Sequence, residues 1–347
     1  MIQIDGSYGE GGGQILRTAL ALSSLLQKPV EINNIRARRS KAGLRPQHLA
    51  AVRSLYLITE AQLLGDQMES PYLQFVPTTL DGGEYIFDIA EERKSAGSIT
   101  LLFQAIFLPL AFAQIPTKVT LRGGTHVAWS PPFHYLKEVF LPALSLMGYR
   151  GSLELHRWGW YPQGLGEAIL QVEPISKLGP ISWMERGKLK GIKGISAASN
   201  LPEHVAQRQA QQAKERLKHL KVPVKIDIMS PESLDQGSFI FLMPELEKGI
   251  AGFSALGERG KRAEKVADEA VDQLFYYLDT GAAIDEHLAD QLILPMAVAQ
   301  GHSSFFTCRI SQHLLTTIWV VKHFLPVEFK IEGSEGEPGK VHCSPGT

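Results

Sequence analysis

The sequence has few cysteines, no strong excess of charge and no long apolar run, and each absence excludes a class of protein. Two cysteines in 347 residues cannot build the disulfide framework of a small secreted domain or a cysteine-rich metal site. A formal net charge of −1 argues against a general polyanion binder, so any contact with nucleic acid must come from a local basic patch. No segment approaches the roughly 18 uninterrupted apolar residues of a membrane span. We therefore expect a cytoplasmic protein that does not use a membrane.

What the chain does contain is an alternation of strand-like and helix-like segments. The apolar pattern predicts strands near 1–5, 30–35, 72–76, 85–89 and 117–121, and helices near 14–26, 47–56 and 133–146. Such an alternation indicates an α/β or α+β fold, and the length allows two to three domains. No convincing internal sequence repeat is visible.

From about residue 186 the pattern changes to that of a compact module of roughly 90 residues, the size of a small domain. It predicts an amphipathic helix over 204–220, strands over 222–228 and 239–243, and a second amphipathic helix over 263–278. We interpret 186–279 as a smaller inserted α/β domain. The large domain is then discontinuous, over 1–185 and 280–340, and 341–347 form a tail.

A glycine-rich loop at residues 9–13 precedes the first predicted helix. Glycines at the start of a helix let backbone N–H groups approach a phosphate. However, the loop lacks the Gly-Lys-Ser/Thr of a Walker A motif and the last glycine of the dinucleotide fingerprint, and a simple flexible turn fits the spacing equally well. Glu10 within the loop would repel a phosphate unless a divalent cation lay between them, and Mg²⁺ typically binds one or two carboxylates together with substrate phosphates.

A second loop concentrates positive charge, with five cations in ten residues at Arg36, Arg38, Arg39, Lys41 and Arg45. One interpretation is a solvated basic loop. The other is a clamp on phosphates, for which the bidentate fork of arginine is well suited, and such a clamp could hold the end of a nucleic acid.

Two helical segments near the C-terminus carry polar side chains. In 285–292, His287, Asp290 and Gln291 share one face, which suits either a purine pocket or a solvated helix surface. In 311–325, Ser311 is the expected N-cap and His313 lies in the first turn, where free backbone N–H groups favour an anion. A histidine at such a position more often caps or packs, so this motif alone does not establish a function.

An aromatic turn at 158–166 contains Trp158, Trp160 and Tyr161 among glycines and a proline. These rings could stack on bases, but buried aromatic residues beside a turn are at least as common.

Taken together, the motifs resemble the RNA 3′-terminal phosphate cyclase family, from residue 5 to about 329. The resemblance rests on the segments 9–17, 35–41, 47–49, 287–292 and 313–316, in the family's order. It implies a large domain of repeated two-helix, four-stranded-sheet units, akin to the initiation-factor C-terminal fold, with a smaller α/β domain inserted. It also implies ATP-dependent conversion of an RNA 3′-phosphate to a 2′,3′-cyclic phosphodiester through a histidyl-AMP and an RNA-adenylate, with release of AMP and pyrophosphate.

The resemblance also implies residue roles. His313 matches the family's nucleophile, and Glu10 would hold Mg²⁺ or Mn²⁺. The terminal phosphate or pyrophosphate would be bound by Arg17, Arg36, Arg39 and Gln47. The pocket for the adenosine of ATP would be lined by Gln104, Pro131, His287, Leu288, Ala289, Asp290 and Gln291. The expected partner is RNA with a 3′-phosphate end, and no feature calls for an obligate protein partner.

A second hypothesis is a non-catalytic cyclase-like protein that binds RNA or assists ribosome assembly. That branch of the family lacks the nucleophilic histidine, so His313 together with Glu10 and Arg17 favours the enzyme. An enolpyruvyl-transferase-like enzyme would share the repeat architecture, but its chemistry does not call for a histidine nucleophile.

Overall fold

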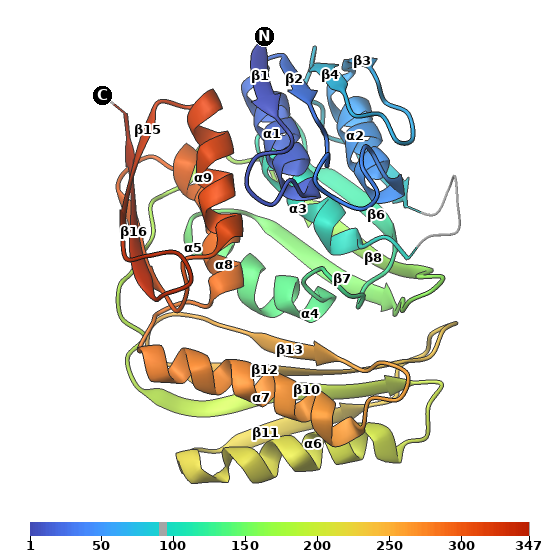
Figure 1. The fold of residues 1–347 in the computed structure, drawn as a ribbon, viewed down its shortest axis with the longest axis vertical. Helices are drawn as coiled ribbons and strands as arrows, with labels where there is room; N and C mark the ends of the chain where they lie inside the picture. The colour runs from blue at the N-terminus through green and yellow to red at the C-terminus, as the bar shows by residue number, and fades with distance from the viewer. Residues whose placement is uncertain (90–95, 347) are drawn as a thin grey trace.

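The computed structural model describes residues 1–89 and 96–346, and these residues form four mixed four-stranded sheets with helices packed against them (Figure 1). The chain is thus a mixture of α and β structure, compatible with an α+β fold. Within the described residues, none of the helices is both long enough and apolar enough to cross a lipid bilayer.

The first sheet is built from the N-terminal quarter of the chain. Its strands lie in the order β1 (Ile2–Asp5), β2 (Val30–Asn33), β4 (Leu73–Val76) and β3 (Gln62–Leu64). β1 and β2 are parallel and the other pairs antiparallel. A parallel pair needs a crossover, which α1 (Gly13–Leu26) provides, and α2 (Pro46–Thr59) leads from β2 to β3.

The second sheet has the same order and pairing. Its strands are β5 (Glu84–Asp88), β6 (Thr117–Gly123), β8 (Gly166–Val172) and β7 (Gly151–Arg157). The crossover is α3 (Ile99–Ala111). The helix expected over 133–146 is present but changes its winding, from α4 (Phe133–Tyr135) through a π-helical turn, η1 (Leu136–Phe140), to α5 (Leu141–Leu146). Pro142 in the first turn of α5 has no N–H to donate, and the regular α-helical hydrogen bonding is interrupted just before it.

The third sheet combines strands from distant parts of the chain. Its order is β9 (Ser182–Trp183), β14 (Ser303–Thr307), β16 (Gly339–Pro345) and β15 (Val327–Glu332), with β9 and β14 parallel. Its helices are α8 (Glu286–Val298) and α9 (Gln312–Phe324). The expectation of a tail at 341–347 is corrected for residues up to 345, because β16 pairs with strands on both sides and buries Val341 and Cys343.

The fourth sheet lies between β9 and α8 in the chain and at the opposite end of the molecule from β1 (Figure 1). Its strands lie in the order β11 (Val224–Met229), β10 (Leu189–Ser199), β12 (Gly237–Leu246) and β13 (Phe253–Leu256). The same part of the chain forms the helices α6 (His204–Leu217) and α7 (Ala263–Thr280) and the 3₁₀ turn η2 (Lys218–Leu220). It has a separate hydrophobic core that includes Ile192, Leu242, Leu274 and Tyr277.

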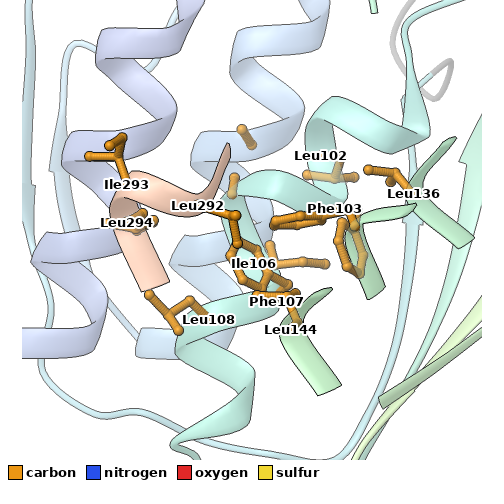
Figure 2. Packing of buried hydrophobic residues seen from close by; sticks show 14 of the residues in the cluster. Leu102, Phe103, Ile106, Phe107, Leu108, Leu136, Leu144, Leu292, Ile293 and Leu294 are labelled. Atoms are coloured by element: carbon orange, nitrogen blue, oxygen red, sulfur yellow. The ribbon is translucent and has the colours of Figure 1, made fainter. Parts of the chain in front are cut away.

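A larger continuous core joins the other three sheets and one face of the fourth, through Ala197, Phe239 and Phe241, and α3 runs through it. Phe103, Ile106 and Phe107 on α3 pack near Leu292 on α8 and Leu144 on α5 (Figure 2). Because α3 is apolar on nearly every side, it can be buried between neighbouring helices. This packing fixes α3 beside α8, and the polar residues on the two helices are thereby held in one place.

Candidate active site

The glycine-rich loop at the N-terminus packs on α9 near the C-terminus (Figure 1). Tyr8 stacks on Trp319, with ring centroids 4.0 Å apart and an angle of 6° between the planes. Gly9 has a φ of +54°, and a Cβ there would lie 2.6 Å from Thr316 Oγ1, so the position requires glycine. The loop therefore holds the first turn of α1 against the first turn of α9.

His313 lies in that first turn of α9, with 46% of its side chain exposed. The expected N-cap is confirmed, because the Ser311 side chain accepts a hydrogen bond from Leu314 N at 3.1 Å. The His313 ring contacts Gln14 on α1 through Nδ1, and its Nε2 lies 3.5 Å from Glu10 Oε2.

The contacts of Gln14 determine which ring nitrogen of His313 carries the proton. The Gln14 amide nitrogen donates to the His313 carbonyl at 2.9 Å and to Thr317 Oγ1. The amide oxygen must then be the atom that faces His313 Nδ1, and it can only accept. Nδ1 therefore donates, and in the neutral ring Nε2 keeps its lone pair.

The surroundings of His313 favour that neutral form. Burial lowers the pKa of His313 below its ordinary value, the positive charge of Arg17, His287 and Arg39 lowers it further, and Glu10 acts in the opposite direction. A neutral imidazole with a free Nε2 is the state in which a histidine acts as a nucleophile.

The arginines of the basic loop take different positions. Arg39 forms an ion pair with Glu10 at 3.0 Å, and Arg38 donates to the Gly9 carbonyl at 3.4 Å. Arg36, predicted to bind phosphate, has a left-handed backbone (φ +55°) and donates to the carbonyls of Lys41 and Gly43. In this structure Arg39 thus reaches the glycine-rich loop, whereas the Arg36 guanidinium closes its own loop.

Glu10 has the chemistry of a metal ligand, but it does not belong to a larger cluster of metal-ligating side chains among the described residues. Within the described ranges 1–89 and 96–346, no group of three His, Cys, Asp or Glu residues could hold a metal ion. A single accessible carboxylate fits a Mg²⁺ ion whose other ligands are substrate phosphates and water, which is the usual arrangement for this ion.

Arg17 and His48 lie beside Gly13, at the end of the glycine-rich loop, and Gln47 precedes His48 in the chain. A Cβ on Gly13 would lie 2.3 Å from His48 Nε2 and 3.0 Å from Arg17 Nη1. Burial lowers the pKa of Arg17 to about 10, and Asp290 opposes this, so the guanidinium stays charged at neutral pH. Gln47 Nε2 is buried and has no hydrogen-bond partner among the described residues, as expected of a donor that awaits a ligand.

His48 should make stability depend on pH. Burial lowers its pKa to about 3, with Arg17 contributing, whereas an unfolded histidine has a pKa of about 6.5. Between these values the unfolded chain binds the proton more readily, so stability is present at neutral pH and is lost as the pH falls below about 6.5. From pH 7.0 to 5.5 this histidine should cost about 1 kcal/mol. Urea unfolding at both pH values should show a smaller loss in His48→Asn, and an equal loss in both proteins would contradict the prediction.

A small cavity of about 50 Å³ lies between α1, α3, α8 and α9. It brings together four predicted site residues from three helices, Arg17, Gln104, Asp290 and Gln291, and Gln14 and Thr317 also line it. Gln291 Oε1 is buried without a partner among the described residues, and burial raises the pKa of Asp290 well above its ordinary value. Since a nucleotide needs several hundred Å³, the cavity can form only the floor of a binding site.

The other predicted adenosine-site residues surround α8. The His287 ring is exposed and lies edge-on to Tyr135, 6.4 Å between centroids. Pro131 accepts a hydrogen bond from Thr100 Oγ1 at 2.7 Å, one helical turn before Gln104. Leu288 and Ala289 are completely buried in the core, so only their backbone could meet a ligand.

Three features of the site were missed from sequence. Gln14 occupies the position of the glycine that the dinucleotide fingerprint requires, and the sequence gives it no other role. The stacking of Tyr8 on Trp319 has no sequence signal. The segment 285–292 is predicted as helical throughout, but Asp285 is the N-cap of α8 and accepts from His287 N and Leu288 N. It also accepts from Tyr135 Oη at 2.7 Å and from Gly252 N, beside β13, at 3.1 Å.

Comparison with known proteins identifies the family to which the chain belongs. Residues 8–331 match the family model described as RNA 3′-terminal phosphate cyclase. Proteins named RNA 3′-terminal phosphate cyclase are similar to the chain in Pyrobaculum neutrophilum (46% identity over 333 residues, 95% of each chain) and Gloeothece citriformis (44% over 327 residues, 93% of each chain). The one from Methanopyrus kandleri is 44% identical over 352 positions, covering 99% of each chain. The chain therefore belongs to the RNA 3′-terminal phosphate cyclase family.

Proposed function

We propose that this protein uses ATP to convert an RNA 3′-terminal phosphate into a 2′,3′-cyclic phosphodiester, with release of AMP and pyrophosphate. The names of its relatives support the overall reaction. The observation that carries the mechanism is the placement of the half-exposed His313 ring. Its Nδ1 faces the Gln14 amide oxygen, and its Nε2 lies beside the glycine-rich loop, 3.5 Å from Glu10 Oε2.

In the first step, His313 Nε2 attacks the α-phosphorus of ATP, the bond to the β-phosphate oxygen breaks, and pyrophosphate leaves. Gln14 keeps the proton on Nδ1 until the new N–P bond places positive charge on the ring, which its amide oxygen then stabilises. The product is a phosphoramidate of AMP on His313.

In the second step, an oxygen of the RNA 3′-phosphate attacks the same phosphorus, and the imidazole leaves. The RNA phosphate is now joined to AMP as a mixed anhydride, so it has a good leaving group. The 2′-hydroxyl oxygen attacks the phosphorus of the RNA phosphate, the anhydride bond to AMP breaks, AMP departs, and the hydroxyl proton passes to solvent. Arg17, Arg39 and Gln47 supply the donors for the RNA phosphate. Arg39 pairs with Glu10, the Arg17 guanidinium lies beside Gly13, and the unpartnered Gln47 amide comes directly before His48, which also lies beside Gly13.

The nucleotide would bind along α8 and α3. Gln104, Asp290 and Gln291 would contact the adenosine from the cavity, and the base would lie between the exposed His287 ring and Pro131. Glu10 would hold Mg²⁺ or Mn²⁺ against the ATP phosphates, and that ion would neutralise charge on the leaving pyrophosphate.

We propose further that the three sheets with one strand order are repeats of a unit akin to the initiation-factor C-terminal fold, and that 186–279 is an inserted domain. All elements of the fourth sheet fall within 189–280, and one face of this sheet has a hydrophobic cluster of its own with α6 and α7. A cytoplasmic location remains a prediction.

Incubation with ATP labelled at the α-phosphate, in the presence of Mg²⁺ or Mn²⁺, tests the proposal. We expect covalent AMP that is labile in acid and stable in alkali, as a phosphoramidate is, and that is discharged by RNA with a 3′-phosphate end. A protein that binds such RNA but takes no label with either metal would instead be the non-catalytic, cyclase-like RNA-binding protein.

A further inference from the structure

Trp129 is 98% exposed, the highest value among the large apolar side chains of the described residues. Leaving an indole in water forgoes roughly 2 to 3 kcal/mol of burial. The residue also has a φ of +64°, a backbone region that non-glycine residues seldom adopt and that tends to occur at functional sites.

The loop that carries Trp129 is tightly held, so its exposure is not the result of a loose segment. Phe133 N donates to Thr125 O at 2.9 Å and closes the loop. Within it, Ser130 Oγ donates to Val127 O at 2.9 Å, and α3 holds Pro131 from outside through Thr100. The loop thus presents the indole to solvent from a fixed base.

A second exposed aromatic residue comes from the neighbouring turn. Thr125 N donates to Gly159 O and Gly159 N donates to Thr125 Oγ1, both at 2.9 Å. The sequence left open whether the aromatic residues of the turn 158–166 could stack on bases. Trp158 and Trp160 are buried, so they cannot. Tyr161, in contrast, is 76% exposed.

These two loops are continuous with the proposed phosphate site. Gly124 N, at the start of the Trp129 loop, donates to Gly97 O at 2.8 Å. A Cβ on Gly97 would lie 3.6 Å from Gln47 Cβ, and Gln47 stands at the start of α2, directly after the arginine-rich loop. One path of contacts therefore leads from the residues proposed to hold the terminal phosphate to the base of Trp129.

We propose that Trp129, assisted by Tyr161, stacks on the bases of the RNA strand that precede the 3′-terminal phosphate. The proposal rests on the proposed function. A chain with a net charge of −1 has little general attraction for RNA, and the arginines near Glu10 are needed at the terminal phosphate. Base stacking adds about 1 to 3 kcal/mol per base and tolerates any sequence, because every base has a flat face.

The test compares Trp129→Ala and Trp129→Phe with the wild type on a 3′-phosphorylated oligoribonucleotide and on a nucleoside 3′-monophosphate, which has no preceding base. In Trp129→Ala we expect formation of covalent AMP and reaction of the monophosphate to be unchanged. The kcat/KM for the oligonucleotide should fall by about 5- to 150-fold, equivalent to the stacking energy of one base. Trp129→Phe should keep most of the activity, and Leu146→Ala, an exposed apolar residue on α5, should behave as wild type.

Direct binding of the labelled oligonucleotide, followed by fluorescence anisotropy without ATP, separates this inference from the catalytic one. Weaker binding by Trp129→Ala supports the stacking role even in a protein that takes no AMP. Unchanged binding and unchanged kcat/KM for the oligonucleotide overturn it. A raised KM for ATP with unchanged RNA binding also overturns it, since the indole would then cover the nucleotide.

Discussion

Replacing His313 with alanine is expected to abolish covalent AMP and to lower the rate of cyclisation by at least about 10,000-fold, as loss of the nucleophile does in other covalent enzymes. Without the imidazole, no atom on α9 can attack the α-phosphorus from that position. Stability should change little, because the ring is half-exposed and its side chain bonds mainly to Gln14. The melting temperature should therefore shift by less than about 2 °C.

His323 provides the matched control for this experiment. It lies at the other end of α9, is exposed, and its Nδ1 lies 2.8 Å from the Trp319 carbonyl. His323→Ala removes the same side chain from the same helix and should retain full labelling and cyclisation. Covalent AMP that persists in His313→Ala would show that another residue is the nucleophile.

Replacing Gly13 with alanine should damage both stability and activity. Alanine in place of glycine within a helix normally gains up to about 1 kcal/mol. Here the new Cβ would lie 2.3 Å from His48 Nε2, and His48 is buried and held by a hydrogen bond from Arg45 N at 3.1 Å. We expect this overpacking to cost about 1 to 3 kcal/mol, so the clash outweighs the gain in propensity. Because α1 carries Gln14 and Arg17, labelling with AMP should also fall.

Gly12→Ala, one residue earlier, separates crowding from a general need for glycine. Its Cβ would come no closer than 3.3 Å to Arg39 Nη2, the end of a flexible side chain, and its backbone is extended. Thermal unfolding and AMP labelling should both be affected less than in Gly13→Ala. Equal effects of the two substitutions would contradict the steric explanation.

The secondary structure was predictable where apolar periodicity and end signals agreed. Around His313, Ser311 and the apolar spacing predicted α9 almost to its ends. The repeated topology was not visible in the sequence, because three sheets can share a strand order while their cores are filled by unrelated side chains. The prediction of a tail at 341–347 was wrong for the residues up to 345. The polar segment 333–338 has the composition of a chain end, but it forms the turn between β15 and β16.

The sequence predicted the separate motifs of the candidate site, but not the contacts between them. Charge clustering indicated the arginine-rich loop, but it could not separate Arg39, which reaches Glu10, from Arg36, which bonds to its own loop. Helical spacing placed His287, Asp290 and Gln291 together. The pairing of Gln14 with His313 joins residues 299 positions apart, and contacts at such separation depend on the packing of α1 against α9.

The Asp285 carboxylate has a consequence for how the two ends of the molecule move. One oxygen orders the first turn of α8 and accepts from Tyr135, while the other accepts from Gly252 beside the fourth sheet. Swinging that sheet away would leave a buried N–H without an acceptor, at a cost of about 1 to 3 kcal/mol. The fourth sheet is therefore bonded through Gly252 to the start of α8, the helix along which adenosine is proposed to bind. A rigid-body movement of the fourth sheet should for this reason also disturb the first turn of α8.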